Sequence, residues 1–143
     1  MTAWRASANS LPLQIVLIVA DGPEAAGLWS QLFIEKGCNV VVENAAQAVY
    51  AARILNPQLV LADLNLPHAD RLALCRTLKL VSGAALMVVI PPRPQEIIES
   101  YAAGVDECLA QPINPALALV KGMAWIMRRQ LPRPHRFALE APL

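Results

Sequence analysis

Five short apolar runs divide the chain, and each is followed by a polar turn and a stretch with helical spacing. Continuous apolar runs bounded by turn residues are typical of strands that are buried on both faces of a sheet. The predicted strands cover residues 14–20, 38–42, 59–62, 85–90 and 107–110. The stretches with helical spacing predict helices over residues 23–36, 44–55, 70–80, 95–103 and 115–129.

Residues that begin or end helices support these boundaries. Pro23 suits the first turn of a helix, because its fixed backbone angle and missing N–H cost nothing there. Asn44 and Asn114 can cap helices with their side-chain oxygens. Gly37 and Gly104 are placed to end helices.

Strands that alternate with helices in this way predict an α/β fold, an open and doubly wound parallel sheet with helices on both faces. In such sheets functional groups gather beyond the carboxyl ends of the strands. Asp21 follows the first predicted strand, and Asp63 ends the third. Ile90 ends the fourth strand, and Gln111 follows the fifth.

The alternating pattern predicts one domain over residues 13–130. Residues 1–12 have no regular pattern and are interpreted as a leader. Residues 131–143 contain three prolines and no helical period, so they are interpreted as a linker or the start of a following output domain.

Composition narrows the class of protein. Of the 143 residues, 56% are hydrophobic and 16% charged, which argues against disorder, and the net charge of +1 does not point to nucleic acid or a membrane. No apolar run reaches the roughly 18 residues of a spanning helix. The apolar run at 13–20 is followed by Asp21 instead of a small-residue cleavage site, which argues against a signal peptide. The scattered cysteines indicate free thiols in the cytoplasm: Cys38, Cys75 and Cys108.

Two carboxylates, Asp21 and Asp63, should converge at one edge of the predicted sheet. Two neighbouring acids repel each other and favour a hard divalent cation between them, and Asn65 could add a backbone carbonyl. Mg²⁺ fits such a site, and a carboxylate beside it can attack a phosphoryl group. The alternative is that Asp21 is a turn residue and Asp63 a helix cap.

Three segments resemble the receiver domains of bacterial response regulators. Residues 15–23, IVLIVADGP, are similar to the family's first strand, which ends in two acids before a proline. Residues 59–67, LVLADLNLP, are similar to its phosphoacceptor segment, and residues 104–114, GVDECLAQPIN, to its fifth strand and the Lys-Pro that follows. The matches are in order and correctly spaced over residues 14–130. The resemblance implies a flavodoxin-like sheet of strand order 2-1-3-4-5 flanked by five helices.

The resemblance also implies roles for these residues. Asp63 would receive phosphate from a sensor histidine kinase or a phosphotransfer protein, and Asp21 and the Asn65 carbonyl would join Asp63 around Mg²⁺. The bond between Gln111 and Pro112 would be cis. The domain would be a cytoplasmic signalling module, and not an enzyme or a membrane protein. It would regulate an attached transcriptional domain, and DNA would be bound only through that missing part.

Four positions depart from the family pattern. Ala20 replaces the first acid of the pair, which weakens the predicted metal site. Ile90 stands where a hydroxyl should bond the phosphoryl group, and it cannot donate a hydrogen bond. Gln111 replaces the lysine, and Cys108 replaces the switch aromatic. We therefore expect Asp63 to be phosphorylated poorly or not used, with the domain acting through protein contacts.

The last predicted helix raises the question of a partner. If Leu117, Val120, Ala124 and Met127 face the sheet, Trp125 lies to one side of that face. Trp125 is then either an edge of the core or part of a homodimer or interdomain surface on the fourth and fifth helices, as the family often uses. The basic cluster near the end of this helix is explained by the helix dipole: Arg128, Arg129, Arg133 and Arg136.

Two other side chains are assigned structural roles. Trp29 lies at helical spacing and is expected in the core, and His68 is expected in a loop. Two other functions compete with an active receiver. One is a phosphorylation-independent interaction module with the same fold. The other, a flavin- or nucleotide-binding protein, is disfavoured because no G-x-G-x-x-G is present and acids follow the first strand.

Overall fold

A computed structural model describes residues 14–130. Its five strands are β1 (Ile15–Ala20), β2 (Asn39–Glu43), β3 (Leu59–Asp63), β4 (Ala85–Ile90) and β5 (Glu107–Ala110). Its helices are α2 (Pro23–Ile34), α3 (Ala45–Leu55), α4 (His68–Val81), α5 (Pro94–Ala102) and α6 (Pro115–Gln130). The interpretations of residues 1–12 and 131–143 as leader and linker fall outside the described residues.

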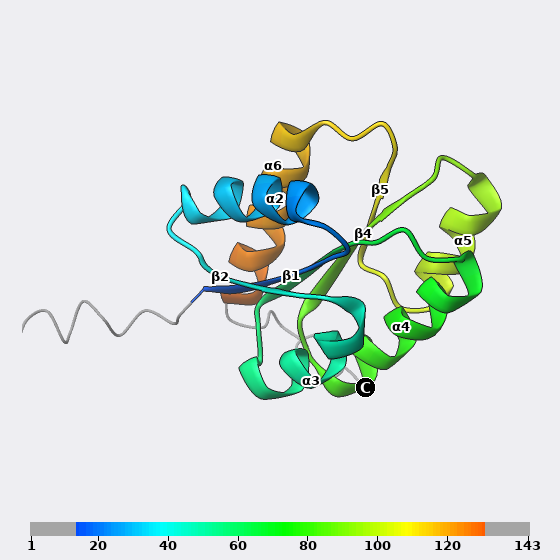
Figure 1. Ribbon diagram of the computed structural model, residues 1–143, viewed down its shortest axis with the longest axis horizontal. Coiled ribbons are helices and arrows are strands. Elements are labelled where there is room, and N and C mark those ends of the chain that lie inside the picture. Colours follow the sequence, from blue (N-terminus) through cyan, green and yellow to red (C-terminus); the bar gives the residue numbers. More distant parts are fainter. Residues whose placement is uncertain (1–13, 131–143) are drawn as a thin grey trace, which may run out of the picture.

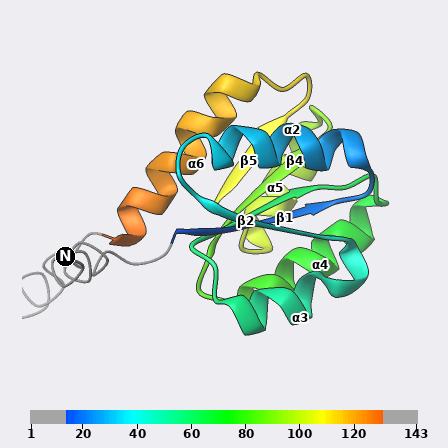
Figure 2. The same cartoon turned by 60° about the vertical axis from the view of Figure 1, so that its left-hand side comes forward.

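The strands form one parallel sheet in the order β2-β1-β3-β4-β5, which confirms the order that the resemblance implied. Helices α2 and α6 cover one face of the sheet, and α3, α4 and α5 cover the other (Figures 1 and 2). Because every crossover passes through a helix, the carboxyl ends of all strands point to one edge of the sheet. Register places Ala20, at the end of β1, opposite Asp63 at the end of β3.

Alternate residues of each strand enter two separate cores. Under α2 and α6 the core contains the large rings of Trp29 and Phe33. Under α3, α4 and α5 it is built partly from small side chains, with Ala48 and Ala52 buried in α3. Because both faces of the sheet are covered, residues pointing to either face are apolar, which explains the continuous apolar runs in the sequence.

The helix caps follow the predicted chemistry in most places. The side chain of Asn44 accepts a hydrogen bond from the N–H of Gln47 at 3.0 Å. The side chain of Asn114 accepts from the N–H of Ala116 at 3.0 Å. Gly104 has a φ of +108°, a conformation that residues with a Cβ rarely adopt, and it follows the end of α5 as predicted.

Two predictions about α4 and α6 were wrong. Helix α4 begins at His68 and not near residue 70, because Pro67 precedes the helix in extended backbone and the first turn already closes behind it. The predicted inner face of α6 is its outer face: Leu117, Val120 and Met127 are more than half exposed. Ala118 and Ile126 are buried instead.

Trp125 lies at the edge of the core, as one of the two interpretations expected. Its indole N–H donates to the Glu107 carboxylate of β5 at 3.1 Å, and Lys121 donates to the same carboxylate at 2.7 Å. The guanidinium of Arg128 lies 4.3 Å from the centre of the Trp125 ring. These contacts hold α6 against the edge strand β5. None of the helices within residues 14–130 is long and apolar enough to cross a membrane.

Candidate functional site

A pocket of about 490 Å³ opens at the carboxyl ends of β1, β3 and β4. Both acids selected from the sequence line it, together with Asn65 and Gln111. The pairing of β1 with β3 explains why, since Ala20 lies opposite Asp63 and Asp21 is the next residue of the chain. The structure therefore brings Asp21 and Asp63 into one pocket, as the sequence predicted.

The side chain of Asp63 turns toward the face of the sheet that α2 covers. Along β3, Leu59 and Leu61 belong to the core under α2 and α6, and Asp63 continues the same alternation. There the indole N–H of Trp29 donates to Asp63 Oδ2 at 2.8 Å. Trp29 is 1% exposed, so its only polar atom is satisfied by the carboxylate at the end of the strand.

Sequence analysis placed Trp29 in the core but missed this contact. A signal was available: a buried tryptophan needs an acceptor for its N–H. Strand parity puts Asp63 on the same face as Leu61, and α2 follows β1 directly. An aromatic N–H two turns into that helix thus has the strand-end carboxylate as a nearby acceptor.

Asp21 is held from the other side of the pocket. Its Oδ2 accepts a hydrogen bond from the backbone N–H of Asn65 at 2.5 Å. Each acid therefore has one oxygen that a fixed donor holds, with Trp29 on Asp63 and Asn65 on Asp21. Asn65 had been expected to contribute its carbonyl, and the structure adds its N–H as a positioning group for the neighbouring acid.

Few groups in the pocket could coordinate a metal ion. Within residues 14–130, no group of three or more His, Cys, Asp and Glu side chains could hold a metal ion. Two carboxylates and a main-chain carbonyl remain, and these hard oxygen donors fit Mg²⁺, which keeps several of its waters. Ala20 cannot add a third acid, and its side chain is buried in the core under α2 and α6.

Ile90 and Cys108 lie on the opposite face of the sheet from Asp63. Ile90 is 1% exposed and packs in the core under α3, α4 and α5, whereas its neighbours Val89 and Pro91 line the pocket. Cys108 packs against that same core. The structure does not bring these two predicted positions into the pocket. It corrects the choice of Ile90, because Val89 is the β4 residue that shares the face of Asp63 and lines the pocket. Gln111 does line it, and the Gln111–Pro112 bond is cis, as the resemblance implied.

A tyrosine lies beside Cys108, the residue that the sequence analysis assigned to the switch aromatic position. The hydroxyl of Tyr101, on α5, accepts a hydrogen bond from the Cys108 N–H at 3.0 Å. Burial raises the pKa of both the Cys108 thiol and the Tyr101 hydroxyl. Sequence analysis missed Tyr101, because only the fold brings the end of α5 over β5.

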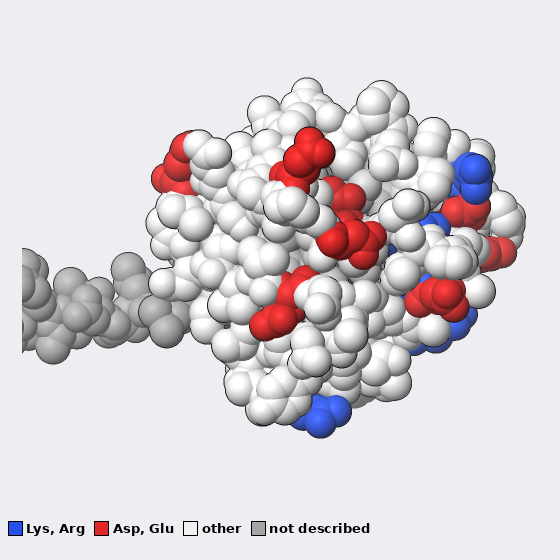
Figure 3. Space-filling view, in the orientation of Figure 1, with Lys and Arg blue, Asp and Glu red and all other residues white. Residues whose placement is uncertain are grey.

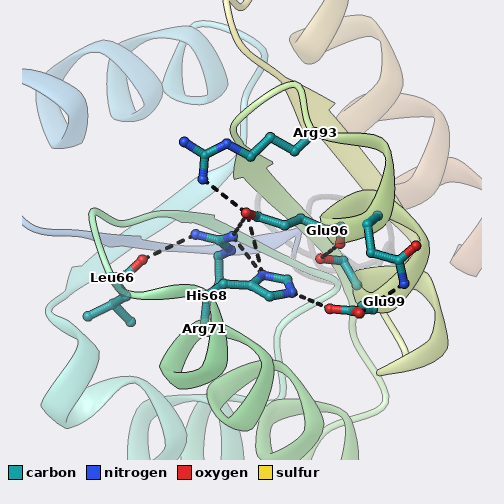
Figure 4. Close-up of polar contacts among 8 residues, drawn as sticks. Leu66, His68, Arg71, Arg93, Glu96 and Glu99 are labelled. Carbon is teal, nitrogen blue, oxygen red and sulfur yellow. Dashed lines mark hydrogen bonds and ion pairs between the residues drawn. The ribbon is translucent and has the colours of Figure 1, made fainter.

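The wall of the pocket next to α5 is a network of charged side chains (Figure 4). Arg71 of α4 is 4% exposed and donates to Glu96 of α5 at 2.9 Å and to the carbonyl of Leu66 at 3.3 Å. Arg71 also lies 3.0 Å from His68 Nδ1, and His68 Nε2 lies 2.7 Å from Glu99. Arg93 adds a second, exposed cation to Glu96 at 3.0 Å.

This network corrects the expectation that His68 is a loop residue. His68 is the first residue of α4, and a single tautomer with its proton on Nε2 accepts from Arg71 and donates to Glu99. The hydrogen bond from Arg93 and the charges of Arg93 and Arg71 lower the pKa of Glu96. Arg71 Nε is buried without a hydrogen-bond partner among the described residues. The network ties α4 to α5 and was not visible in the sequence, since its members are separated by a whole strand.

Charge is unevenly distributed on the face that carries the site. In Figure 3, acidic groups lie near the middle of the face, where β1 passes into α2 in Figure 1, and the basic groups lie toward the rim. Among the pocket-lining residues the acids are Asp21, Asp63 and Glu96, and the bases Arg71 and Arg93 are both paired with Glu96. The acids near β1 thus lack the neighbouring cation that a lysine at position 111 would supply.

Known proteins resemble this chain over most of its length. The DNA-binding response regulator MtrA of Mycolicibacterium smegmatis is 28% identical over 119 residues, which cover 82% of this chain and 52% of that protein. MtrA of Mycobacterium tuberculosis is 27% identical over 80% of this chain and 51% of its own length. The chain therefore spans about half the length of the curated relatives it matches.

Solved structures share the fold. A two-component response regulator from Clostridium difficile superposes with a TM-score of 0.74 at 19% identity, over 82% of this chain and 99% of that one. A CheY-like receiver domain protein from Methanospirillum hungatei gives 0.72 at 23% identity, over 82% and 97%. The family model for the response regulator receiver domain matches residues 16–121. Together with the parallel sheet and its strand-end acids, this match shows that the chain belongs to the response regulator receiver domain family.

Proposed function

We propose that Asp63 is the phosphoacceptor of this receiver and that its phosphorylation is slow. The observation that carries the proposal is the placement of Asp63 at the end of β3, in one pocket with Asp21 and with a fixed N–H donor on one oxygen. The other oxygen of Asp63 would attack phosphorus and displace the donor's leaving group. The phosphoryl group would come from a sensor histidine kinase or a phosphotransfer protein in the cytoplasm.

The pocket has parts of the required chemistry and lacks others. Asp21, Asp63 and the Asn65 carbonyl are the groups that would hold Mg²⁺, which when bound offsets negative charge on phosphoryl oxygens. Gln111 lines the pocket and can donate a hydrogen bond, but it brings no charge. Val89, the β4 residue that lines the pocket, has no hydrogen-bond donor in its side chain. These replacements support slow rather than absent phosphorylation.

The proposal also includes an output domain attached to this receiver. Because the matching relatives are about twice as long as the shared region, we infer that this receiver controls a following output domain, reached through residues 131–143. Two of those relatives are described as DNA-binding response regulators. Any contact of this protein with DNA would be made by that output domain and not by residues 14–130.

Labelling with a small phosphodonor tests the proposal. The protein is incubated with Mg²⁺ and ³²P-labelled acetyl phosphate, beside the Asp63→Asn variant. We expect slow labelling of the native protein and none of the variant. Rapid stoichiometric labelling that disappears in Asp63→Asn would contradict the weakened site, and equal labelling of both proteins would exclude Asp63 as the acceptor.

A second function, a phosphorylation-independent interaction module, is favoured by the Arg71 network. The network joins α4 to α5 through side chains of the chain itself, and Val89 offers no hydroxyl to the pocket. For such a module, Mg²⁺ and acetyl phosphate should leave both tryptophan fluorescence and the thermal midpoint unchanged. A shift of either quantity that Asp63→Asn abolishes would favour the phosphoacceptor.

The exposed apolar residues of α5 and α6 support the proposed homodimer. Ile98 is 60% exposed on α5, and Val120 is 63% exposed on α6. Exposed apolar side chains of this size are common at contacts between subunits. Sedimentation of the native protein beside Val120→Glu checks it, with a dimer expected only for the native protein. A monomer at all concentrations would contradict the dimer.

A further inference from the structure

The hydrogen bond between Trp29 and Asp63 places a neutral donor directly on the proposed phosphoacceptor. The N–H lies 2.8 Å from Oδ2. The ring is buried among Ile18, Phe33 and Leu61 in the core under α2 and α6, so the donor cannot swing away without disturbing that core. Asp63 Oδ2 is therefore held by a fixed donor, while its other oxygen has no hydrogen-bond donor among the described residues.

We propose that Trp29 shortens the lifetime of phosphorylated Asp63 by stabilising the free carboxylate. This inference rests on the proposed function, since it needs Asp63 to be phosphorylated. It assigns the two oxygens different roles. Oδ1 carries the phosphoryl group, and Oδ2, held by the indole, becomes the carbonyl oxygen of the acyl phosphate.

The direction of the effect follows from charge. In the free carboxylate, Oδ2 carries about half of the negative charge, and an N–H bond to an ionised acceptor is roughly twice as strong as one to a neutral acceptor. In the acyl phosphate, Oδ2 is a neutral carbonyl oxygen, so the same N–H stabilises it less. Trp29 therefore favours the unphosphorylated state over the phosphorylated state.

Hydrolysis of the acyl phosphate restores that charge. The oxygen of water bonds to phosphorus, the bond between phosphorus and Oδ1 breaks, and its electron pair stays on the Asp63 carboxylate. The protons of water leave with inorganic phosphate and solvent. In a loose transition state the bond to the leaving oxygen is largely broken, so most of the charge has already returned to the carboxylate. The indole N–H then stabilises the transition state as well as the product.

The tryptophans of the domain supply a matched pair of variants. Trp29→Phe keeps an aromatic ring in the core and removes the N–H. Trp125→Phe removes the other described indole, which donates to Glu107 and does not line the pocket. Each protein is labelled with ³²P-acetyl phosphate, freed of donor, and followed by the loss of label in the presence of Mg²⁺. Thermal midpoints show whether each variant is folded at the assay temperature.

We expect the half-life of the label to lengthen about fivefold in Trp29→Phe and to stay unchanged in Trp125→Phe. A native half-life in Trp29→Phe, with the native protein clearly labelled, overturns the role of Trp29 and leaves Asp63 as the acceptor. Absence of label in the native protein and in both variants is a different result, because it removes the proposed function and this inference together.

A measurement without phosphate guards against a variant that fails to fold. The indole ¹H–¹⁵N resonance of Trp29 is recorded by NMR in the native protein and in Asp63→Asn. A hydrogen bond to a carboxylate shifts this resonance downfield, and we expect it to move upfield when an amide replaces the carboxylate. The Trp125 resonance should stay in place. An unmoved Trp29 resonance would show that the bond is absent and would overturn the inference.

Discussion

The two faces of the sheet differ in how well they keep the parts of a receiver. The face under α2 and α6 carries Asp63, which alternates with Leu59 and Leu61 and is bonded to Trp29. The face under α3, α4 and α5 carries Cys108, the position where the sequence predicts that the switch aromatic is replaced. That face also has the ion pairs centred on Arg71.

The difference separates the proposed phosphoacceptor from the predicted switch position. Strand alternation puts Asp63 on the face under α2 and α6, whereas Cys108 packs on the face under α3, α4 and α5. The Arg71–Glu96 pair joins α5 to α4 through side chains of the chain itself. We infer that the second face is held in one arrangement by its own contacts. Four predictions test this contrast.

Loss of Arg71 should have the largest effect on stability. Its guanidinium is buried and donates to Glu96 and to the Leu66 carbonyl, and Arg71→Met removes both hydrogen bonds while Arg93 still pairs with Glu96. Losing hydrogen bonds that involve a charged group costs roughly 2–3 kcal/mol. Urea unfolding of the variant measures the change in the free energy of unfolding.

Arg93 provides the matched control for that measurement. It pairs with the same carboxylate, but its side chain is 69% exposed. An exposed ion pair contributes about 1 kcal/mol or less, so Arg93→Met should be nearly neutral. Equal losses in the two variants would show that burial does not make Arg71 more important for stability than Arg93. The inference that the Arg71 network fixes α4 to α5 would then be wrong.

The tightly packed face is tested at Gly122 of α6. A Cβ there would lie 2.7 Å from Phe33 Cζ and 3.2 Å from Leu59 Cδ2. Alanine normally favours a helix over glycine by about 1 kcal/mol, but overpacking a core costs about 1–3 kcal/mol. We therefore expect Gly122→Ala to lower the free energy of unfolding by up to about 2 kcal/mol.

At Gly27 of α2, substitution by alanine should change the free energy of unfolding in the opposite direction. Nothing lies within 4 Å of a Cβ built on it. Gly27→Ala should therefore raise the free energy of unfolding by up to about 1 kcal/mol in the same urea experiment. Stabilisation by both alanines would mean that the Phe33 ring can move aside and that the core under α2 and α6 is looser than its burial suggests.

The fold followed from the sequence because its pattern is local. Strands buried on both faces read as continuous apolar runs, and Pro23, Asn44 and Asn114 mark helix starts where the structure has them. The inner face of α6 did not follow, since Leu117 and Ala118 are both apolar and only the packing of α6 on α2 decides between them. The small Ala118 and Gly122 face inward because α6 lies close to Phe33.

The acids of the site could be predicted because strand ends of a parallel sheet converge, and Asp21 and Asp63 do share the pocket. Their partners could not. Trp29 meets Asp63 across 34 residues of chain, and Arg71 meets Glu96 across 25. Such pairs depend on how far each helix is rotated, which hydrophobic periodicity fixes only to within one side chain.

A lysine at position 111 tests whether the acceptor face needs only its missing charge. Gln111 lines the pocket and is exposed, so Gln111→Lys should fit without strain. An ammonium group near the phosphoryl oxygens forms stronger hydrogen bonds than a neutral amide, and we expect labelling by acetyl phosphate to quicken roughly tenfold. No change in rate would mean that the charge at this position is not what limits phosphorylation.

The smallest expected effect is the pH dependence that the ion pairs give to stability. The hydrogen bond from Arg93, followed by the charges of Arg93 and Arg71, lowers the pKa of Glu96 in the folded protein below its ordinary value of 4.5. A carboxyl with a lowered pKa stabilises the fold above its unfolded pKa, and this contribution disappears as the pH falls through the folded pKa. The thermal midpoint should therefore fall on acidification below about pH 4.5, less steeply in Glu96→Gln than in the native protein. Glu24→Gln is the control, because Glu24 has no ion pair among residues 14–130, and its slope should match the native one. If the thermal midpoint of Glu96→Gln falls with pH as steeply as that of the native protein, the network between α4 and α5 does not depend on that carboxylate. The contrast between the two faces then rests on packing alone.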